Sequence, residues 1–375
     1  MDFESFLMIF IADVFMYLMI ISLLSYTLKK NAFQYKSRYY ISVIYLIIFC
    51  MFPVYDTDYF HYMQIIKNLT MGGKTNLEDF YINLVNLVDG SYTLFRLIVW
   101  GTAICLSIWL SKISNINKSL FLFILVGVFI TKFAYTRAFL AMITGIVSVP
   151  LLFKKDSDFK HILLGIILLL LSLNFHKSAA FTLPMILISF LCLKMNKRNI
   201  KIYFLLYPIA FLLMNALLKY IVNFDSSESE LAVNSAQYYL QSTGSYGFGI
   251  STMISYLTNR SVYYLIVILY ICLVYKGYFA QFPRHIKMFA NLSFFIITIS
   301  TLFYFITSLN ANAFYYRFLY FSMVPNAVLL TYCISNRIYY KFSKFIVLFG
   351  ILGVLYTFMY NFYASFFVHF DINNI

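Results

Sequence analysis

Long apolar runs, separated by short polar clusters, dominate the pattern of this chain. The run from Ile162 to Leu173 is apolar at almost every position, without the alternation of a membrane β-strand. A helix needs about 20 mostly apolar residues to cross a bilayer. The pattern therefore predicts an all-α, polytopic transmembrane helical bundle of about 12 spans. These are expected near 6–28, 39–53, 92–110, 119–135, 138–153, 162–174, 178–193, 202–222, 262–280, 288–308, 314–333 and 345–367.

Composition excludes a water-soluble globule, because 62% of the 375 residues are apolar and only 11% are charged. The spans use nearly the whole length, so we expect one integral membrane domain over residues 1–375, with long loops at about 54–91 and 223–261. The acidic start, with Asp2 and Glu4, is unlike a secretory signal, so the first span is expected to stay. All five cysteines lie in apolar spans and are expected to be packing residues.

Basic residues divide the loops into two sets. Six alternate loops hold 19 of the 28 Lys and Arg residues and only two acids, Asp156 and Asp158. These loops are 29–38, 111–118, 154–161, 194–201, 276–287 and 335–344. The positive-inside rule predicts that they face the cytoplasm, which leaves both termini and the two long loops outside. Because the net charge of +14 is spread over many loops, no nucleic-acid partner is expected.

A second group of basic residues lies at or just within the outer ends of spans. Its members are Arg96, Arg137, Lys177, Arg260 and Arg317, with Lys132 deeper in its span. Helix N-termini favour anions, and the arginine fork binds phosphate oxygens in pairs. The group therefore indicates a diphosphate-binding site. The alternative for each residue is that it extends to lipid phosphates at the interface.

Candidate catalytic residues follow two of the outer span ends. Asp56 and Asp58 can share a divalent cation or supply a general base, or they can cap the helix that follows. Tyr59 and Tyr62 suit stacking on sugar rings. His176 can act as a base or a phosphate donor, although a lone interfacial histidine is the alternative. No cofactor is expected, and these residues leave metal use open.

Four short blocks resemble EpsG-like and Wzy-type polysaccharide polymerases. They are Tyr55-Asp56-Thr57-Asp58-Tyr59, Thr136-Arg137-Ala138-Phe139-Leu140-Ala141, Phe175-His176-Lys177-Ser178-Ala179 and Tyr316-Arg317-Phe318. The resemblance implies a glycosyltransferase of GT-C-like architecture in the bacterial inner membrane, inside the lipid bilayer. Such proteins extend O-antigen or exopolysaccharide by moving a chain from its polyprenyl diphosphate onto a fresh lipid-linked repeat. The implied partners are polyprenyl-diphosphate-linked oligosaccharide and a chain-length regulator.

This interpretation assigns roles to the candidate residues. The basic residues neutralise the departing diphosphate, His176 or one of Asp58 and Asp56 takes a hydroxyl proton, and the two tyrosines pack on sugars. A flippase for the same lipid-linked oligosaccharide and a membrane acyltransferase remain alternatives. The chain has no P-loop, nucleophile elbow or H-E-x-x-H motif, so ATP-driven transport and common hydrolase chemistry lack support. The long outer loops favour an enzyme over an alternating-access carrier.

Overall fold

The computed structural model describes residues 3–28, 36–51, 59–72, 79–130, 136–155, 157–201, 250–306 and 319–371. Within these ranges every regular element is a helix and no strand occurs, which confirms the all-α class. The helices are α1 (Phe3–Thr27), α2 (Lys36–Met51), α3 (Tyr59–Thr70), α4 (Asp79–Leu87), α5 (Tyr92–Ile113), α6 (Lys118–Phe129), α7 (Thr136–Phe153), α8 (Phe159–Phe175), the 3-10 helix η2 (Lys177–Phe181), α9 (Thr182–Leu191), α12 (Ile250–Tyr275), α13 (Tyr278–Gln281), α14 (Arg284–Ile306), α16 (Met323–Ser335) and α17 (Tyr340–Asp371).

Four helices are long and apolar enough to cross a membrane: Phe10–Thr27, Tyr92–Ile113, Thr136–Phe153 and Tyr340–Met359. Shorter apolar helices accompany them in α2, α6, α8, α9, α12 and α16. A described helix overlaps each predicted span except the one near 202–222, which lies outside the described residues. The chain is therefore an integral membrane protein, while the number of 12 spans and the GT-C-like architecture stay predictions.

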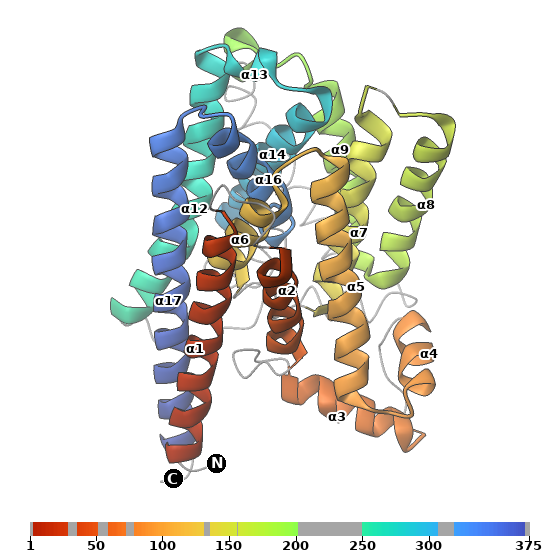
Figure 1. Cartoon of the computed structure of the whole chain (residues 1–375), viewed down its shortest axis with the longest axis vertical. Helices are drawn as coiled ribbons and strands as arrows, with labels where there is room; N and C mark the ends of the chain where they lie inside the picture. The colour runs from red at the N-terminus through yellow and green to blue at the C-terminus, as the bar shows by residue number, and fades with distance from the viewer. Residues whose placement is uncertain are drawn as a thin grey trace.

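Apart from α3 and α4, the long helices run along the bundle, and the described parts of the six basic loops lie toward one end of it, which we call the basic end (Figure 1). Contacts between these loops confirm the grouping. The ammonium of Lys118 lies 4.5 Å from the ring centre of Tyr39. His285 Nε2 lies 3.2 Å from the Ser114 carbonyl oxygen. Both termini, α3 and α4 lie at the opposite end (Figure 1).

The first and last helices pack together against α6. The Tyr17 hydroxyl on α1 donates to the carbonyl of Gly127 on α6 at 2.8 Å, and its ring lies 5.5 Å from that of Phe358 on α17. A Cβ added at Gly350 of α17 would lie 2.5 Å from Cγ1 of Val128 on α6. The helices therefore approach closely where glycine omits a side chain, as is common in membrane bundles.

α7 is the most enclosed of the four long spans, with 78% of its apolar window buried. It packs along α8, where a Cβ at Gly165 would lie 2.9 Å from Leu152 Cγ. Nearer the start of α7, the absence of a side chain at Gly145 leaves room for Ser172 of α8 and Thr182 of α9. By contrast, α8 exposes Leu163, Ile166, Leu170 and other large apolar side chains on its outer face, as expected of a lipid-facing helix.

Candidate functional site

Arg137 occupies the second position of α7, at the end of the bundle opposite the basic loops. Its side chain is half-buried, and its guanidinium carbon lies 5.9 Å from the ring centre of Tyr81 on α4. The first turn of a helix leaves backbone N–H groups unpaired and carries partial positive charge. The backbone and the side chain therefore both favour an anion at this position.

His176 ends α8 and turns the chain into η2. Its backbone is extended, with φ −166° and ψ 130°, and its N–H donates to the Ser172 carbonyl at 3.3 Å. Its own carbonyl accepts from the N–H of Ala179 at 2.9 Å, which holds the first turn of η2. The imidazole is half-buried at the same end of the bundle as Arg137. Lys177 opens η2, and its side chain lies outside the described part.

The short helix α4 connects these two positions. Tyr81 is fully buried beneath Arg137. The adjacent Phe80 packs edge-on against Phe175, the residue before His176, with ring centres 4.7 Å apart. Tyr81 also contacts Phe95 of α5 at 5.9 Å. One aromatic helix thus binds the starts of α5 and α7 and the end of α8 into a single region.

A family model matches residues 53–370 of the chain, which include all of this region. The chain belongs to the EpsG family. No curated protein and no solved structure matches it. EpsG membership agrees with the integral membrane character of the helices and associates the chain with polysaccharide polymerase-type activity, in which a membrane-borne lipid-linked glycan is the substrate. It confirms the family that the four sequence blocks predicted.

Arg96 of this EpsG protein is a buried residue with 1% of its surface exposed. Its Nη2 and Nε donate to the Cys50 carbonyl at 2.8 and 3.1 Å, and its Nη1 donates to the Tyr92 hydroxyl at 3.0 Å. Cys50 lies in the last turn of α2, where backbone carbonyls lack helical partners. Arg96 therefore fastens the end of α2, directly before the block that contains Asp56 and Asp58. Its role in diphosphate binding stays a prediction.

Two of the basic residues lie beyond the first turn of their helices. α12 begins at Ile250 rather than near 262, so Arg260 lies in its third turn. α5 begins at Tyr92, which places Arg96 in the second turn. The helix dipole acts mainly within the first turn. The expectation of helix N-terminal support is therefore wrong for Arg260, and it is confirmed for Arg137.

Several predicted site residues, or their side chains, lie outside the described part of the chain. Asp56, Asp58, Lys132 and Arg317 lie outside the described residues. Tyr59 and Tyr62 belong to the first turn of α3, and Arg260 to α12, but their side chains are not described. Among the described residues no group of three or more His, Cys, Asp or Glu side chains could hold a metal ion. Metal use by the two aspartates therefore stays an open prediction.

Sequence reasoning treated residues 54–91 as a loop and missed the role of α4. A signal was present, because Tyr81, Leu84, Val85 and Val88 recur at the spacing of one helical face. The structure buries all four of them. This pattern predicts a short amphipathic helix. The contact of Tyr81 with Arg137 joins residues 56 positions apart, and no local sequence pattern predicts it.

Proposed function

We propose that this EpsG protein polymerises polyprenyl-diphosphate-linked oligosaccharide repeats at the outer face of the bacterial inner membrane. The observation that supports it is the region around α4. There Arg137, at a helix N-terminus, and His176 belong to one group of packed helices. A basic site for a diphosphate beside a proton acceptor is what transfer from a diphosphate-linked sugar needs.

In the proposed reaction a hydroxyl of the acceptor sugar attacks the anomeric carbon of the donor chain. A new carbon–oxygen bond forms while the bond between that carbon and the diphosphate oxygen breaks, and polyprenyl diphosphate leaves. The hydroxyl proton passes to His176 or to Asp58 or Asp56. Arg137, with Arg317, Arg260, Lys177 and Lys132, stabilises the charge that develops on the leaving group. Arg96 contributes through its hold on α2.

Polarity across the membrane is part of the proposal. The basic end would face the cytoplasm, because positively charged loops stay on that side. The α4 region would then lie at the outer headgroups, with both termini on the same side (Figure 1). The donor is already activated by its diphosphate, so the reaction would need no nucleotide.

The direct test combines purified protein with its lipid-linked repeat in the absence of ATP and scores a ladder of chain lengths on a gel. Arg137→Ala is expected to slow chain extension by about 100-fold, the typical cost of losing one preorganised charge donor. The rate of chain extension by the Arg137→Lys protein should lie between those of Arg137→Ala and wild type, because lysine keeps the charge but loses the planar fork. The matched control is Arg198→Ala, which removes an exposed arginine at the basic end.

A wild-type ladder from the Arg137→Ala protein would remove Arg137 from the proposed site. Translocation of intact single repeats across proteoliposomes without any extension would contradict the polymerase proposal and identify a flippase. Transfer of an acyl group to the glycan, with no change in chain length, would instead identify the acyltransferase alternative.

A further inference from the structure

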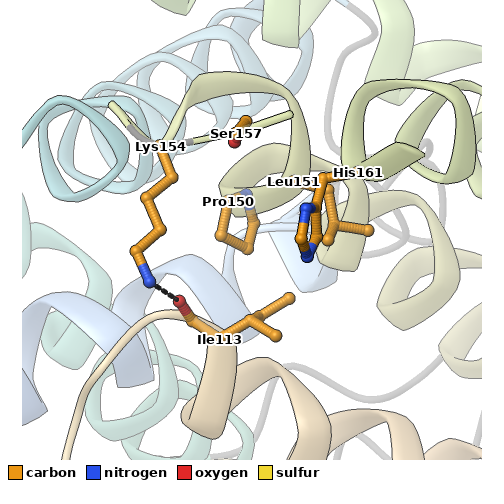
Figure 2. Close-up of a pocket in the computed structure, with 6 residues that line it drawn as sticks. All are labelled: Ile113, Pro150, Leu151, Lys154, Ser157 and His161. Atoms are coloured by element: carbon orange, nitrogen blue, oxygen red, sulfur yellow. Dashed lines mark hydrogen bonds between the residues drawn. The ribbon is translucent and has the colours of Figure 1, made fainter. Parts of the chain in front are cut away.

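A small cavity lies at the basic end of the bundle, far from the region around Arg137. Its volume is about 140 Å³, and it is lined by Ile113 at the end of α5, Pro150 and Leu151 in the last turns of α7, and Lys154, Ser157 and His161 around the start of α8 (Figure 2). The lining combines apolar side chains with an ammonium, a hydroxyl and an imidazole. The proposed polymerase chemistry uses none of these groups.

Lys154 brings a partly buried positive charge to this cavity. Its ammonium donates to the Ile113 carbonyl at 3.2 Å, as Figure 2 shows. With its amide turned, Asn115 offers an oxygen 3.3 Å from the same nitrogen. A lysine ammonium has three donors. The two oxygens can thus hold Lys154 in place while its third N–H stays available to a ligand.

The start of α8 supplies the other polar groups. Asp158 caps the helix by accepting the His161 N–H at 2.8 Å, and its carboxylate also contacts Nδ1 of the His161 ring. These hydrogen bonds from His161 lower the pKa of Asp158. Because Asp158 occupies Nδ1, the Nε2 atom is the ring nitrogen left to meet a ligand. Ser157 adds a hydroxyl that can donate or accept.

The surroundings favour a negative ligand. Asp158 is the only acid among the described residues of the six basic loops, whereas Lys112, Lys155 and Lys160 lie close to this cavity in the sequence. The positive charge of Lys154 also acts on His285, whose pKa is lowered first by burial and further by this charge. An anion placed beside Lys154 would relieve this repulsion between cations.

We propose that this cavity binds a phosphate group, and that the phosphate belongs to an anionic lipid of the leaflet at the basic end. A water molecule needs only roughly 10–15 Å³ of cavity volume, so the cavity has room for a phosphate group. Further along α8, on the side that His161 occupies, the exposed side chains of Leu164, Ile167 and Leu171 recur at helical spacing and offer an apolar track for an acyl chain. The inference is independent of the polymerase reaction.

The test uses the full-length protein after delipidation in detergent. Dihexanoyl phosphatidylglycerol, dihexanoyl phosphatidylcholine and inorganic phosphate are titrated separately, and bound adducts are counted by native mass spectrometry. Phosphatidylglycerol is expected to bind more tightly than the zwitterionic lipid. Binding of inorganic phosphate at the same residues would mean that the anion comes from solution, which would overturn the lipid source but support the phosphate site.

Ser157→Asp introduces a negative charge into the cavity without removing either partner of Lys154, and it should weaken phosphatidylglycerol binding by roughly tenfold or more. His161→Gln should weaken it by a smaller factor. The matched control is Lys160→Gln, which removes a neighbouring positive charge outside the cavity lining and should change affinity less than about twofold. Equal affinity for Ser157→Asp and wild type would overturn the proposal.

Discussion

The guanidinium of the half-buried Arg137 lies over the ring of Tyr81, which is fully buried. A cation over an aromatic face gains about 0.5–2 kcal/mol, depending on how well water is excluded. Tyr81 does not need to touch a substrate to matter, because it orients the arginine that does so in the proposed reaction. It is a positioning residue. Substitutions of Tyr81 should separate the effect of its ring on chain extension from the effect of its hydroxyl.

Tyr81→Phe keeps the ring and is expected to leave chain extension within about twofold of wild type. Tyr81→Leu removes the ring face and should raise the donor KM by roughly 2- to 30-fold, as the energy of a lost cation–π contact implies. The control is Phe279→Leu, because Lys287 lies 5.9 Å from that ring at the basic end. Equal effects of the two leucine variants on donor KM would show a general loss of packing instead.

His285 offers a pH test at the basic end. Only 6% of its surface is exposed, and burial lowers its pKa below the usual 6.5. The unfolded chain therefore takes up a proton at a higher pH than the folded protein, and stability falls as the pH drops below about 6.5. Melting temperatures measured in detergent at pH 7.5 and 5.5 should show this decrease.

The His285→Gln protein should show a weaker dependence of melting temperature on pH, since glutamine can still donate to Ser114 but does not titrate. His161→Gln serves as the control, because His161 is exposed. An unchanged pH dependence in the His285→Gln protein would mean that other groups cause it.

At the scale of the helices, the sequence predicted the existence of most elements and missed some of their ends. A run of about 20 apolar residues has few alternatives in a membrane, so eleven of the expected spans overlap described helices. The start of α12 was missed, because the helix continues back through Ser251, Thr252 and Asn259, residues that are as common in loops. The partner of Arg96 was also missed, since a backbone carbonyl 46 positions away carries no residue-type signal.

The contact of α6 with α17 can be tested by adding one methyl group. Gly350→Ala would place Cβ 2.5 Å from Cγ1 of Val128, a β-branched side chain with little freedom to move. Overpacking of this kind typically costs about 1–3 kcal/mol. The thermal midpoint of the purified protein should fall, and the second substitution Val128→Ala should restore most of the loss.

The matched control is Gly101→Ala on α5, where a Cβ would meet nothing within 4 Å. This change should be neutral or raise stability by up to about 1 kcal/mol. A similar loss in both glycine variants would show that the tight contact between α6 and α17 is not the cause.

At the scale of the whole molecule, sidedness follows from the charge of the loops. Asn86 of α4 and Lys341 of α17 are both exposed and lie at opposite ends of the bundle. Each is replaced by cysteine in a background where the five native cysteines are serine or alanine. A thiol reagent that cannot cross membranes should label position 86 on intact cells and position 341 only after lysis.

Labelling of both positions on intact cells would contradict the predicted topology. Labelling of position 341 alone would reverse it, and the α4 region would then face the cytoplasm, where the proposed polymerase reaction could not take place. Cys50 and Cys333 should react slowly in the wild-type protein, since both are buried.

The contact between α1 and α17 has a consequence for the biogenesis of the protein. Tyr17 of α1 packs against Phe358 of α17, so α1 cannot complete its contacts until α17, which is made much later, is inserted. During most of translation, α1 must rest among lipids or beside an insertase. A message truncated before residue 340 would release a protein with an open flank, which a membrane protease could recognise.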